Sequence, residues 1–284
     1  MVLKKQEKDH NSLNDNMGYP CLKIDLKKIE HNCKTINERC TEKGIAVVGV
    51  SKCVLGDLKI AEIFKNQGIT IIGDSRLKNL KKLRMHFSND VKLCMLRTPM
   101  LSEIEEMVRI CDISMNTQAE VLKSISSLCK IYNIYHNIII MVETDDRREG
   151  LLPKEVADFC DFILSRCPRV KIYGIGTNAR CISEKKPACE SIQILVKLKK
   201  ELEKAFRINI PVISGGNSSI WSLIESGALP AEVNQVRIGE AILFGHETSE
   251  YSRIDNTFDD AFLLEAEVIE TKKAGGSIYK ILIA

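Results

Sequence analysis

A regular alternation of short apolar segments and amphipathic segments constrains the fold of this chain more than any other feature. Each apolar segment is followed by a segment in which apolar residues recur at helical spacing. The eight apolar segments are residues 45–52, 69–74, 91–97, 113–116, 138–144, 170–178, 211–214 and 235–238. Strands that alternate with helices are typical of a parallel sheet, and eight such pairs predict an α/β fold, a (β/α)₈ TIM barrel. A doubly wound open sheet is the alternative, but the count of eight favours the barrel.

The two ends of the chain depart from this pattern. Residues 1–17 are polar and charged, which predicts a disordered N-terminal tail. The barrel is expected to occupy residues 18–247. Residues 248–284 start with a polar, irregular stretch, and residues 261–272 then have the pattern of one more strand. We expect residues 248–284 to form a truncated C-terminal β extension.

Composition excludes several classes of function. A net charge of +3 and an aromatic content of 5% give no electrostatic case for nucleic acid binding. The 11 cysteines lack the close pair spacing of a zinc or redox site, so no metal is expected. No apolar run approaches the ~18 residues of a membrane span. Without a secretory leader, the cysteines indicate a reducing cytoplasm.

The first apolar segment ends on a lysine, Lys52. An ammonium at the end of a buried strand must find a partner, lose its proton or leave the core. A lysine held in this way can lose its proton and form a Schiff base with an aldehyde. From this segment alone, a lysine paired with a carboxylate is the simpler interpretation.

Chemistry in a TIM barrel lies at the carboxyl ends of the strands, where this chain has several cations. The most informative segment is Ser-Gly-Gly-Asn-Ser-Ser at residues 214–219, after the seventh strand. Its glycines allow close approach of the backbone to a ligand, and the helix that follows offers N–H groups. Residues 237–240 supply the loop after the eighth strand. Barrels often build a phosphate site from these two loops, so we predict a phosphate cradle here.

A phosphate cradle together with a lysine at the end of the first strand fits a phosphorylated aldehyde, pyridoxal phosphate. Arg237, at the end of the eighth strand, would donate to the pyridine nitrogen of this cofactor. Its fixed positive charge would keep that nitrogen unprotonated. The alternative for Arg237 is an ion pair with Glu240 or Glu143.

Five sequence segments occur in the order found in a known family. They are Val-Gly-Val-Ser-Lys-Cys, Arg-Arg-Glu-Gly-Leu-Leu, Gly-Ile-Gly-Thr-Asn, Ser-Gly-Gly-Asn-Ser-Ser and Gln-Val-Arg-Ile-Gly-Glu-Ala-Ile-Leu-Phe-Gly. Together they resemble the alanine racemase N-terminal domain family, the fold-type III pyridoxal phosphate enzymes. Residues 74–80 and 113–117 are similar to the ornithine racemase branch of that family. The resemblance covers roughly residues 20–272.

The resemblance implies roles for individual residues. Lys52 matches the Schiff-base lysine, which also serves as one of two proton-transfer bases. Arg148 matches the arginine that reaches the cofactor's phenolic oxygen and the substrate carboxylate. Asn178 stands where alanine racemases have a histidine near the pyridine ring. The predicted catalytic residues are Lys52 and Arg148, and the predicted cofactor-binding residues are Lys52, Asn178, Ser214, Gly216, Asn217, Ser218, Arg237, Gly239 and Glu240.

The chain also departs from the family pattern. Gly56 stands where alanine racemases have a tyrosine that contacts the phosphate. Asp145 and Asp146 precede the site arginine where a glycine is usual in the branch. The family's C-terminal β domain, which supplies the second base to the partner subunit's site, is here reduced to one strand and a short tail. Tyr279 and Cys181 are the candidates for that second base.

The resemblance implies an amino-acid racemase that exchanges the Cα proton with pyridoxal phosphate as cofactor. The expected substrate is ornithine or another basic or small amino acid, and a homodimer is expected. Glu143, Asp145 and Asp146 are the acidic residues nearby for a distal ammonium. A non-catalytic barrel that binds pyridoxal phosphate in cofactor homeostasis and a truncated, inactive racemase are the alternatives.

Overall fold

The computed structural model describes residues 18–144, 146–180, 186–274 and 277–283, with side chains described as far as Lys272. The chain forms two compact units. The larger unit is Leu26–Ala261, and the smaller unit combines Met1–Asp25 with Phe262–Ala284. The disordered tail predicted at residues 1–17 lies outside the described residues.

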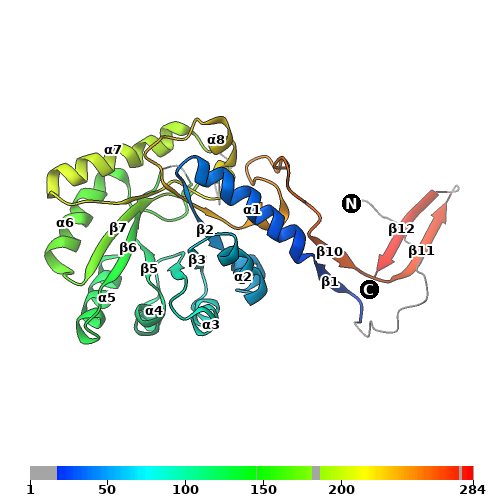
Figure 1. The fold of residues 1–284 in the computed structure, drawn as a ribbon, viewed down its shortest axis with the longest axis horizontal. Helices are drawn as coiled ribbons and strands as arrows, with labels where there is room; N and C mark the ends of the chain where they lie inside the picture. Colours follow the sequence, from blue (N-terminus) through cyan, green and yellow to red (C-terminus); the bar gives the residue numbers. More distant parts are fainter. Residues whose placement is uncertain (1–17, 145, 181–185, 275–276, 284) are drawn as a thin grey trace. The chain divides into compact units, whose positions relative to one another are not determined.

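Eight parallel strands of the larger unit close into a barrel (Figure 1). In order around the barrel they are β2 (Ala46–Val50), β3 (Ile71–Asp74), β4 (Lys92–Met95), β5 (Ile113–Asn116), β6 (His136–Met141), β7 (Val170–Gly176), β8 (Val212–Ser214) and β9 (Gln235–Ile238). β9 pairs with β2 and places Val48 opposite Arg237. This pairing confirms the predicted TIM barrel, because β2 and β9 would not meet in an open sheet.

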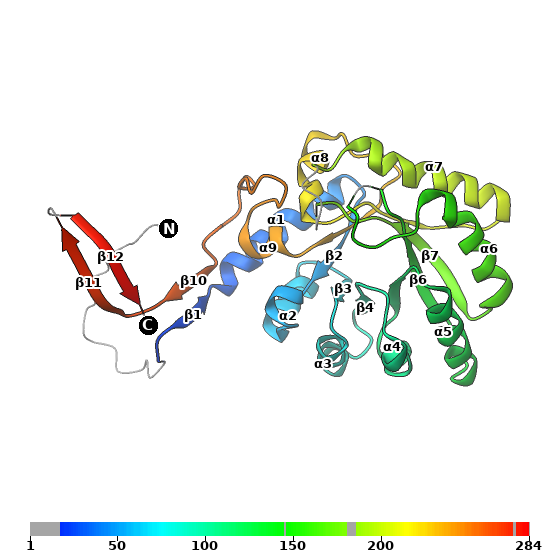
Figure 2. The same cartoon turned by 180° about the vertical axis from the view of Figure 1, so that it is seen from behind.

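A helix follows each barrel strand, and α2 to α7 lie on the outside of the strands in both views (Figure 1, Figure 2). The helices are α1 (Leu26–Glu42), α2 (Leu58–Asn66), α3 (Leu77–Phe87), α4 (Ile104–Ile110), α5 (Ala119–Ile131), α6 (Val156–Arg166), α7 (Cys189–Phe206), α8 (Trp221–Ser226) and α9 (Glu240–Phe244). Short 3₁₀ segments are η1 (Lys52–Val54), η2 (Leu101–Glu103), η3 (Pro153–Glu155) and η4 (Ser218–Ile220). Local sequence fixes some of these ends. The Asp57 carboxylate, for example, caps α2 by accepting from the N–H groups of Lys59 (3.0 Å) and Ile60 (3.1 Å).

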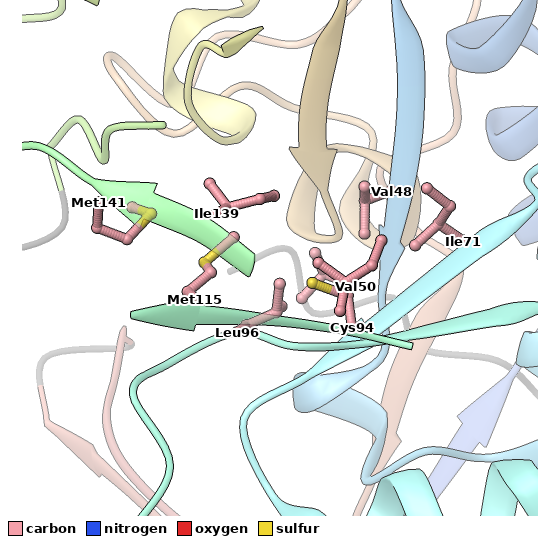
Figure 3. Packing of buried hydrophobic residues seen from close by; sticks show 9 residues of the cluster. Val48, Val50, Ile71, Cys94, Leu96, Met115, Ile139 and Met141 are labelled. Atoms are coloured by element: carbon pink, nitrogen blue, oxygen red, sulfur yellow. The ribbon is translucent and has the colours of Figure 1, made fainter. Parts of the chain in front are cut away.

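Side chains that point into the barrel form one apolar cluster (Figure 3). Its buried members are Val48, Val50, Ile71, Cys94, Leu96, Ile113, Met115, Ile139 and Met141. Successive residues of a strand point to opposite faces, so these members recur two positions apart along the chain. Gly49, between Val48 and Val50, faces α2, because a Cβ at this position would lie 2.6 Å from the Phe64 ring. This alternation ends with β2 at Val50, and Lys52 is an exposed residue of the turn that follows.

The smaller unit contains two antiparallel pairs of strands. β1 (Cys21–Ile24) pairs with β10 (Phe262–Glu265), and β11 (Val268–Ala274) pairs with β12 (Ser277–Ile283). The single strand predicted at residues 261–272 is wrong, because residues 266–267 divide it into strands that pair with different partners. The sequence did not predict β12 either. The predicted domain boundaries after residues 17 and 247 stay predictions.

The ten cysteines of the described residues are free thiols. Burial raises the pKa of Cys33 and of Cys94 to about 12, so these two side chains stay protonated at neutral pH and act as small apolar groups. Within the part of the chain that the structure describes, no helix has the length and apolar character needed to cross a membrane.

Candidate active site

A cavity of about 340 Å³ lies at the carboxyl ends of the barrel strands. Its floor is apolar and includes Val50, Leu96 and Met115, which belong to the barrel cluster. The charged residues of its lining are Lys52, Arg148, Arg180, Arg237, Glu149 and Glu240. Cations outnumber carboxylates, so the cavity suits a small anionic ligand.

Lys52 reaches the cavity because the chain turns directly after β2. The turn η1 begins at Lys52, and Leu55 ends it with a φ of 52°, in the left-handed region. Cys53 lies beside Lys52 in the lining. Burial raises the pKa of the Cys53 thiol, and the nearby Glu240 charge adds to this effect. The thiol next to Lys52 therefore stays protonated at neutral pH.

Arg237 is a firmly held cation of the cavity, with only 5% of its surface exposed. Its guanidinium donates to the Ser214 hydroxyl (2.6 Å), to the Ser214 carbonyl (3.3 Å), to the Asn178 side-chain oxygen (2.9 Å) and to the Thr177 carbonyl. These four acceptors are neutral. The guanidinium is thus fixed in position and keeps its positive charge.

The loops after β8 and β9 come together, as their predicted role in a phosphate cradle requires. The Asn217 side-chain oxygen accepts from the Ser219 N–H (2.9 Å) and orders the start of η4. The Ser218 hydroxyl accepts from the Ala241 N–H (3.3 Å). Ser218 and Gly239 therefore line the same side of the cavity.

Arg148 and Glu149 lie in the loop after β6. Gly150 anchors this loop with a φ of +145°, and a Cβ at Gly150 would lie 2.4 Å from the Glu143 backbone nitrogen. Only glycine fits there. Two backbone hydrogen bonds of 2.9 Å then join Leu151 to Met141 and to Glu143. This attachment directs Arg148 and Glu149 to the cavity, where their side chains form an ion pair of 2.7 Å.

Most of the predicted site residues meet at this cavity. Those in its lining are Lys52, Arg148, Asn178, Asn217, Ser218, Arg237, Gly239 and Glu240. Ser214 and Gly216 are not among the lining residues. Instead, Ser214 binds the Arg237 guanidinium, and the Gly216 carbonyl accepts from the Arg237 N–H (3.0 Å). Their direct contact with a cofactor stays a prediction.

The acidic residues and the second bases predicted from the sequence are not found among the described residues that line the cavity. Glu143 and Asp146 do not line this cavity. Asp145 and Cys181 lie outside the described residues, and so does the Tyr279 side chain.

Sequence reasoning missed five polar lining residues: Cys53, Glu149, Arg180, Thr248 and Tyr251. Glu149 stands directly after Arg148 in a segment already recognised, so its neighbour was the available signal. Thr248 and Tyr251 lie in the irregular stretch after α9, where no local pattern marks a site. Tyr251 has a φ of 58°, which is unusual for a bulky residue, and its ring lies 5.7 Å from that of His246.

The backbone at Gly56 explains why this chain has a glycine where the family resemblance implies a tyrosine. Gly56 has a φ of +61°, and a Cβ at this position would lie 3.0 Å from the Asn79 Cβ. A side chain here would combine left-handed backbone strain with a close contact. The phosphate contact that alanine racemases make at this position is therefore not available from Gly56.

A closed parallel barrel with a lysine, a fixed arginine and a glycine-rich loop around one cavity defines an α/β-barrel protein with the layout of an enzyme active site. The chain belongs to the family described as alanine racemase, N-terminal domain, whose model matches residues 24–247. This membership confirms the resemblance found in the sequence.

Two curated relatives and one solved structure illustrate the similarity. The lysine racemase of Thermotoga maritima is 38% identical over 258 residues, which cover 90% of this chain and 71% of that protein. The ornithine racemase of Acetoanaerobium sticklandii is 34% identical over 257 residues, with coverage of 90% and 71%. The alanine racemase of Clostridium difficile 630 in complex with cycloserine has a TM-score of 0.71 at 16% identity, over 91% of this chain and 71% of that one. This last likeness is one of fold.

Proposed function

We propose that this protein is a pyridoxal-phosphate-dependent amino-acid racemase that acts on a basic amino acid. One observation carries the proposal: Lys52, Arg148 and Arg237 surround a single cavity in a chain that is similar to a lysine racemase and to an ornithine racemase. Neither the fold nor the cations alone would distinguish a racemase from other barrel proteins.

The residues around the cavity fit pyridoxal phosphate by the chemistry of their donors. Ser218 and the backbone at Gly239 would hold the phosphate, and Arg237 would hold the pyridine nitrogen. Phosphate oxygens and an unprotonated pyridine nitrogen are acceptors, and these protein groups are donors. Pyridoxal phosphate, when bound, supplies an aldehyde that joins an amine and a ring that draws electron density from the amino acid's Cα.

The chain's own residues bind the amino acid and move its proton. Arg148 binds the substrate carboxylate through charge-assisted hydrogen bonds. The Lys52 amine takes the proton from Cα on one face, and a second group returns a proton on the other face. One proton leaves and one returns, so only the configuration at Cα changes. Arg237 provides a fixed positive charge and gives up no proton.

The second proton-transfer group has three candidates. Tyr279 and Cys181 are the candidates predicted from the sequence. The structure adds Tyr251, which lines the cavity. A phenol can donate a proton to Cα and be recharged from solvent.

A basic substrate needs a negative charge near its distal ammonium. Among the described residues, the carboxylates that line the cavity belong to Glu149 and Glu240. The Glu149 side chain is 28% exposed and lies 2.7 Å from Arg148, whereas the Glu240 side chain is 41% exposed and lies 3.9 Å from the His246 ring nitrogen. We assign the distal ammonium to Glu240, because its carboxylate is the more accessible of the two.

The direct test is an assay of chirality. The purified protein is loaded with pyridoxal phosphate and incubated with L-lysine, L-ornithine or L-alanine, and the D isomers are separated by chiral chromatography. We expect D-lysine or D-ornithine to form faster than D-alanine. Bound cofactor absorbance without any D isomer would contradict the proposal and favour the non-catalytic cofactor-binding barrel or the inactive racemase.

A homodimer and a cytoplasmic location belong to the same proposal and rest on the family resemblance and on the free thiols. Light scattering at micromolar concentration would report a mass near twice 32.0 kDa for a dimer. A mass near 32.0 kDa would exclude the dimer under those conditions.

A further inference from the structure

Four polar side chains form a continuous chain of hydrogen bonds across the cavity. We call this chain, Arg148–Glu149–Asn178–Arg237, the mouth relay. Arg237 donates to the Asn178 oxygen (2.9 Å), the Asn178 amide nitrogen donates to Glu149 Oε1 (2.8 Å), and Arg148 Nε donates to Glu149 Oε2 (2.7 Å). It connects the loop after β6 to the ends of β7 and β9.

The chemistry of the four groups gives the mouth relay one possible direction. A guanidinium can only donate hydrogen bonds, and a carboxylate can only accept them. Only a group that accepts at one end and donates at the other can link Arg237 to Glu149, and the Asn178 amide does both. Because Arg237 is buried and held by three residues, its position determines which way the Asn178 amide faces. The Asn178 amide in turn fixes the Glu149 carboxylate.

Arg148, at the outer end of the mouth relay, is the residue whose position must be fixed by its neighbours. The Arg148 side chain is 33% exposed and comes directly after Arg147, whose φ is +54°. A long side chain on a loop loses rotamer entropy when a ligand orders it. A charge-assisted bond to Glu149 orders Arg148 beforehand, and Gly150 holds the loop that carries both residues.

We propose that Glu149 is a positioning residue. Through Asn178, it holds the Arg148 guanidinium at a fixed position relative to the Arg237 guanidinium. Arg148 is the group that we expect to bind the substrate carboxylate, and Arg237 the group that we expect to bind the cofactor ring, so this inference rests on the proposed function. Glu149 links the two ends of the site without itself touching the reacting atoms.

An isosteric exchange tests the direction of the mouth relay. Glu149→Gln leaves one acceptor where two are needed, so the bond to Arg148 or the bond to Asn178 is lost. Asn178→Asp places one carboxylate against another. In the double variant N178D/E149Q, the carboxylate at position 178 accepts from Arg237 and from the amide N–H at position 149. The amide oxygen at position 149 accepts from Arg148. The double variant therefore restores every link, with the same total charge as the original chain.

Two measurements report the outcome. In thermal unfolding without cofactor or substrate, we expect each single variant to lower the midpoint by about 3–6 °C and the double variant to recover most of this loss. In the racemase assay, we expect E149Q to raise the KM for the amino acid about tenfold with kcat changed by less than about threefold, and the double variant to lower the KM again.

A charge-matched control separates direction from net charge. N178D/E240Q also removes one carboxylate from the cavity but restores no link, so its unfolding midpoint should stay as low as that of N178D. Equal recovery in N178D/E240Q and N178D/E149Q, or no recovery in either, would overturn the inference. If the unaltered protein shows no racemisation, the proposed function fails, while unfolding of the cofactor-free variants still decides whether the mouth relay exists.

Discussion

A polar cluster between the strands β2 and β3 and the helix α3 differs from the mouth relay, because its hydrogen bonds stay within the cluster. Asp74 is fully buried, and its carboxylate accepts from the Ser51 hydroxyl (2.8 Å), the Arg76 N–H (2.8 Å) and the Asn79 amide (3.1 Å). We call this group, Ser51, Asp74, Arg76 and Asn79, the outer cluster. It closes on itself between the strands and α3. The mouth relay instead ends on Arg148, which opens to the cavity.

The two groups use similar residues, so their difference comes from the face on which each residue lies. Ser51 and Lys52 are neighbours in sequence, yet Ser51 joins the outer cluster and Lys52 lines the cavity. A polar group that faces the helices must find its partners within the protein, or it costs stability. A polar group above the inward face can leave part of its bonding capacity to a ligand. We therefore expect changes in the outer cluster to affect stability alone, and changes in the mouth relay to affect binding as well as stability.

Lys52→Ala should give the largest effect and tests the inward side of this comparison. We expect the visible absorbance of bound cofactor to disappear and racemase activity to fall at least about 10³-fold, because the variant lacks both the amine and the proton-transfer base. Absorbance spectra and the chiral assay measure both losses. Lys59→Ala, at an exposed position of α2, is the matched control and should retain both signals. A variant at Lys52 that keeps the cofactor band would contradict the assignment.

Asp74→Ala tests the outward side. Removal of this buried carboxylate leaves several donors without an acceptor, so we expect a loss of about 4 kcal/mol in the free energy of unfolding. Asp74→Asn keeps one acceptor and should lose about half as much. Urea denaturation measures both, and Asp90→Ala on the surface should change little. If Asp74→Asn weakens cofactor affinity more than it lowers stability, the outer cluster also shapes the site and the comparison breaks.

His136 gives a pH-dependent test of the same face. Its ring nitrogen Nε2 lies 2.8 Å from the Ser114 hydroxyl, and burial lowers its pKa to about 4, only partly opposed by Asp112. The unfolded chain, with an ordinary histidine pKa near 6.5, binds a proton that the folded chain excludes. The contribution of neutral His136 to folding stability is therefore fully present above pH ~6.5. The free energy of unfolding should fall by about 3 kcal/mol as the pH drops to about 4.

Urea denaturation at several pH values measures this slope. His136→Gln should flatten the slope between pH ~6.5 and about 4. Equal slopes in the original chain and in His136→Gln would show that the acid sensitivity arises elsewhere.

Gly56→Ala should give the smallest effect and sharpens the boundary between the two groups. Gly56 has a left-handed backbone, and the added Cβ would contact Asn79, a member of the outer cluster. We therefore expect a loss of about 1 kcal/mol in the free energy of unfolding. Thermal unfolding measures it. Gly227→Ala, at a glycine with a φ of +71° and open space around its Cβ, separates the backbone strain from the contact. If Gly56→Ala costs no more than Gly227→Ala, packing against Asn79 does not restrict this position.

Much of the fold was predictable because it depends on local patterns. The predicted strands at 113–116 and 235–238 agree with β5 and β9. Apolar spacing within one segment determines its helical or extended form. The predicted strand at 261–272 failed because its division into β10 and β11 depends on pairing with β1 and β12, which are distant or weakly patterned segments.

The site was predictable where a residue lies at, or a few positions after, the carboxyl end of a strand. Lys52, Ser218 and Arg237 have such positions, and they line the cavity. Glu149 and Tyr251 do not, since each belongs to a loop whose course depends on anchors elsewhere. Gly150 and the Leu151 hydrogen bonds place Glu149, and no repeating pattern in the sequence marks those contacts.

The sequence by itself determined the number of barrel strands, their order along the chain and the strand ends that carry charge, because apolar spacing acts over a few residues. Only the tertiary structure decided that Ser51 binds Asp74 while Lys52 lines the cavity, and that Asn178 lies between Glu149 and Arg237. These contacts arise when β9 pairs with β2 and the ring closes. Closure fixes the register of strands that are far apart in sequence, and register together with loop anchors such as Gly150 determines which polar groups meet.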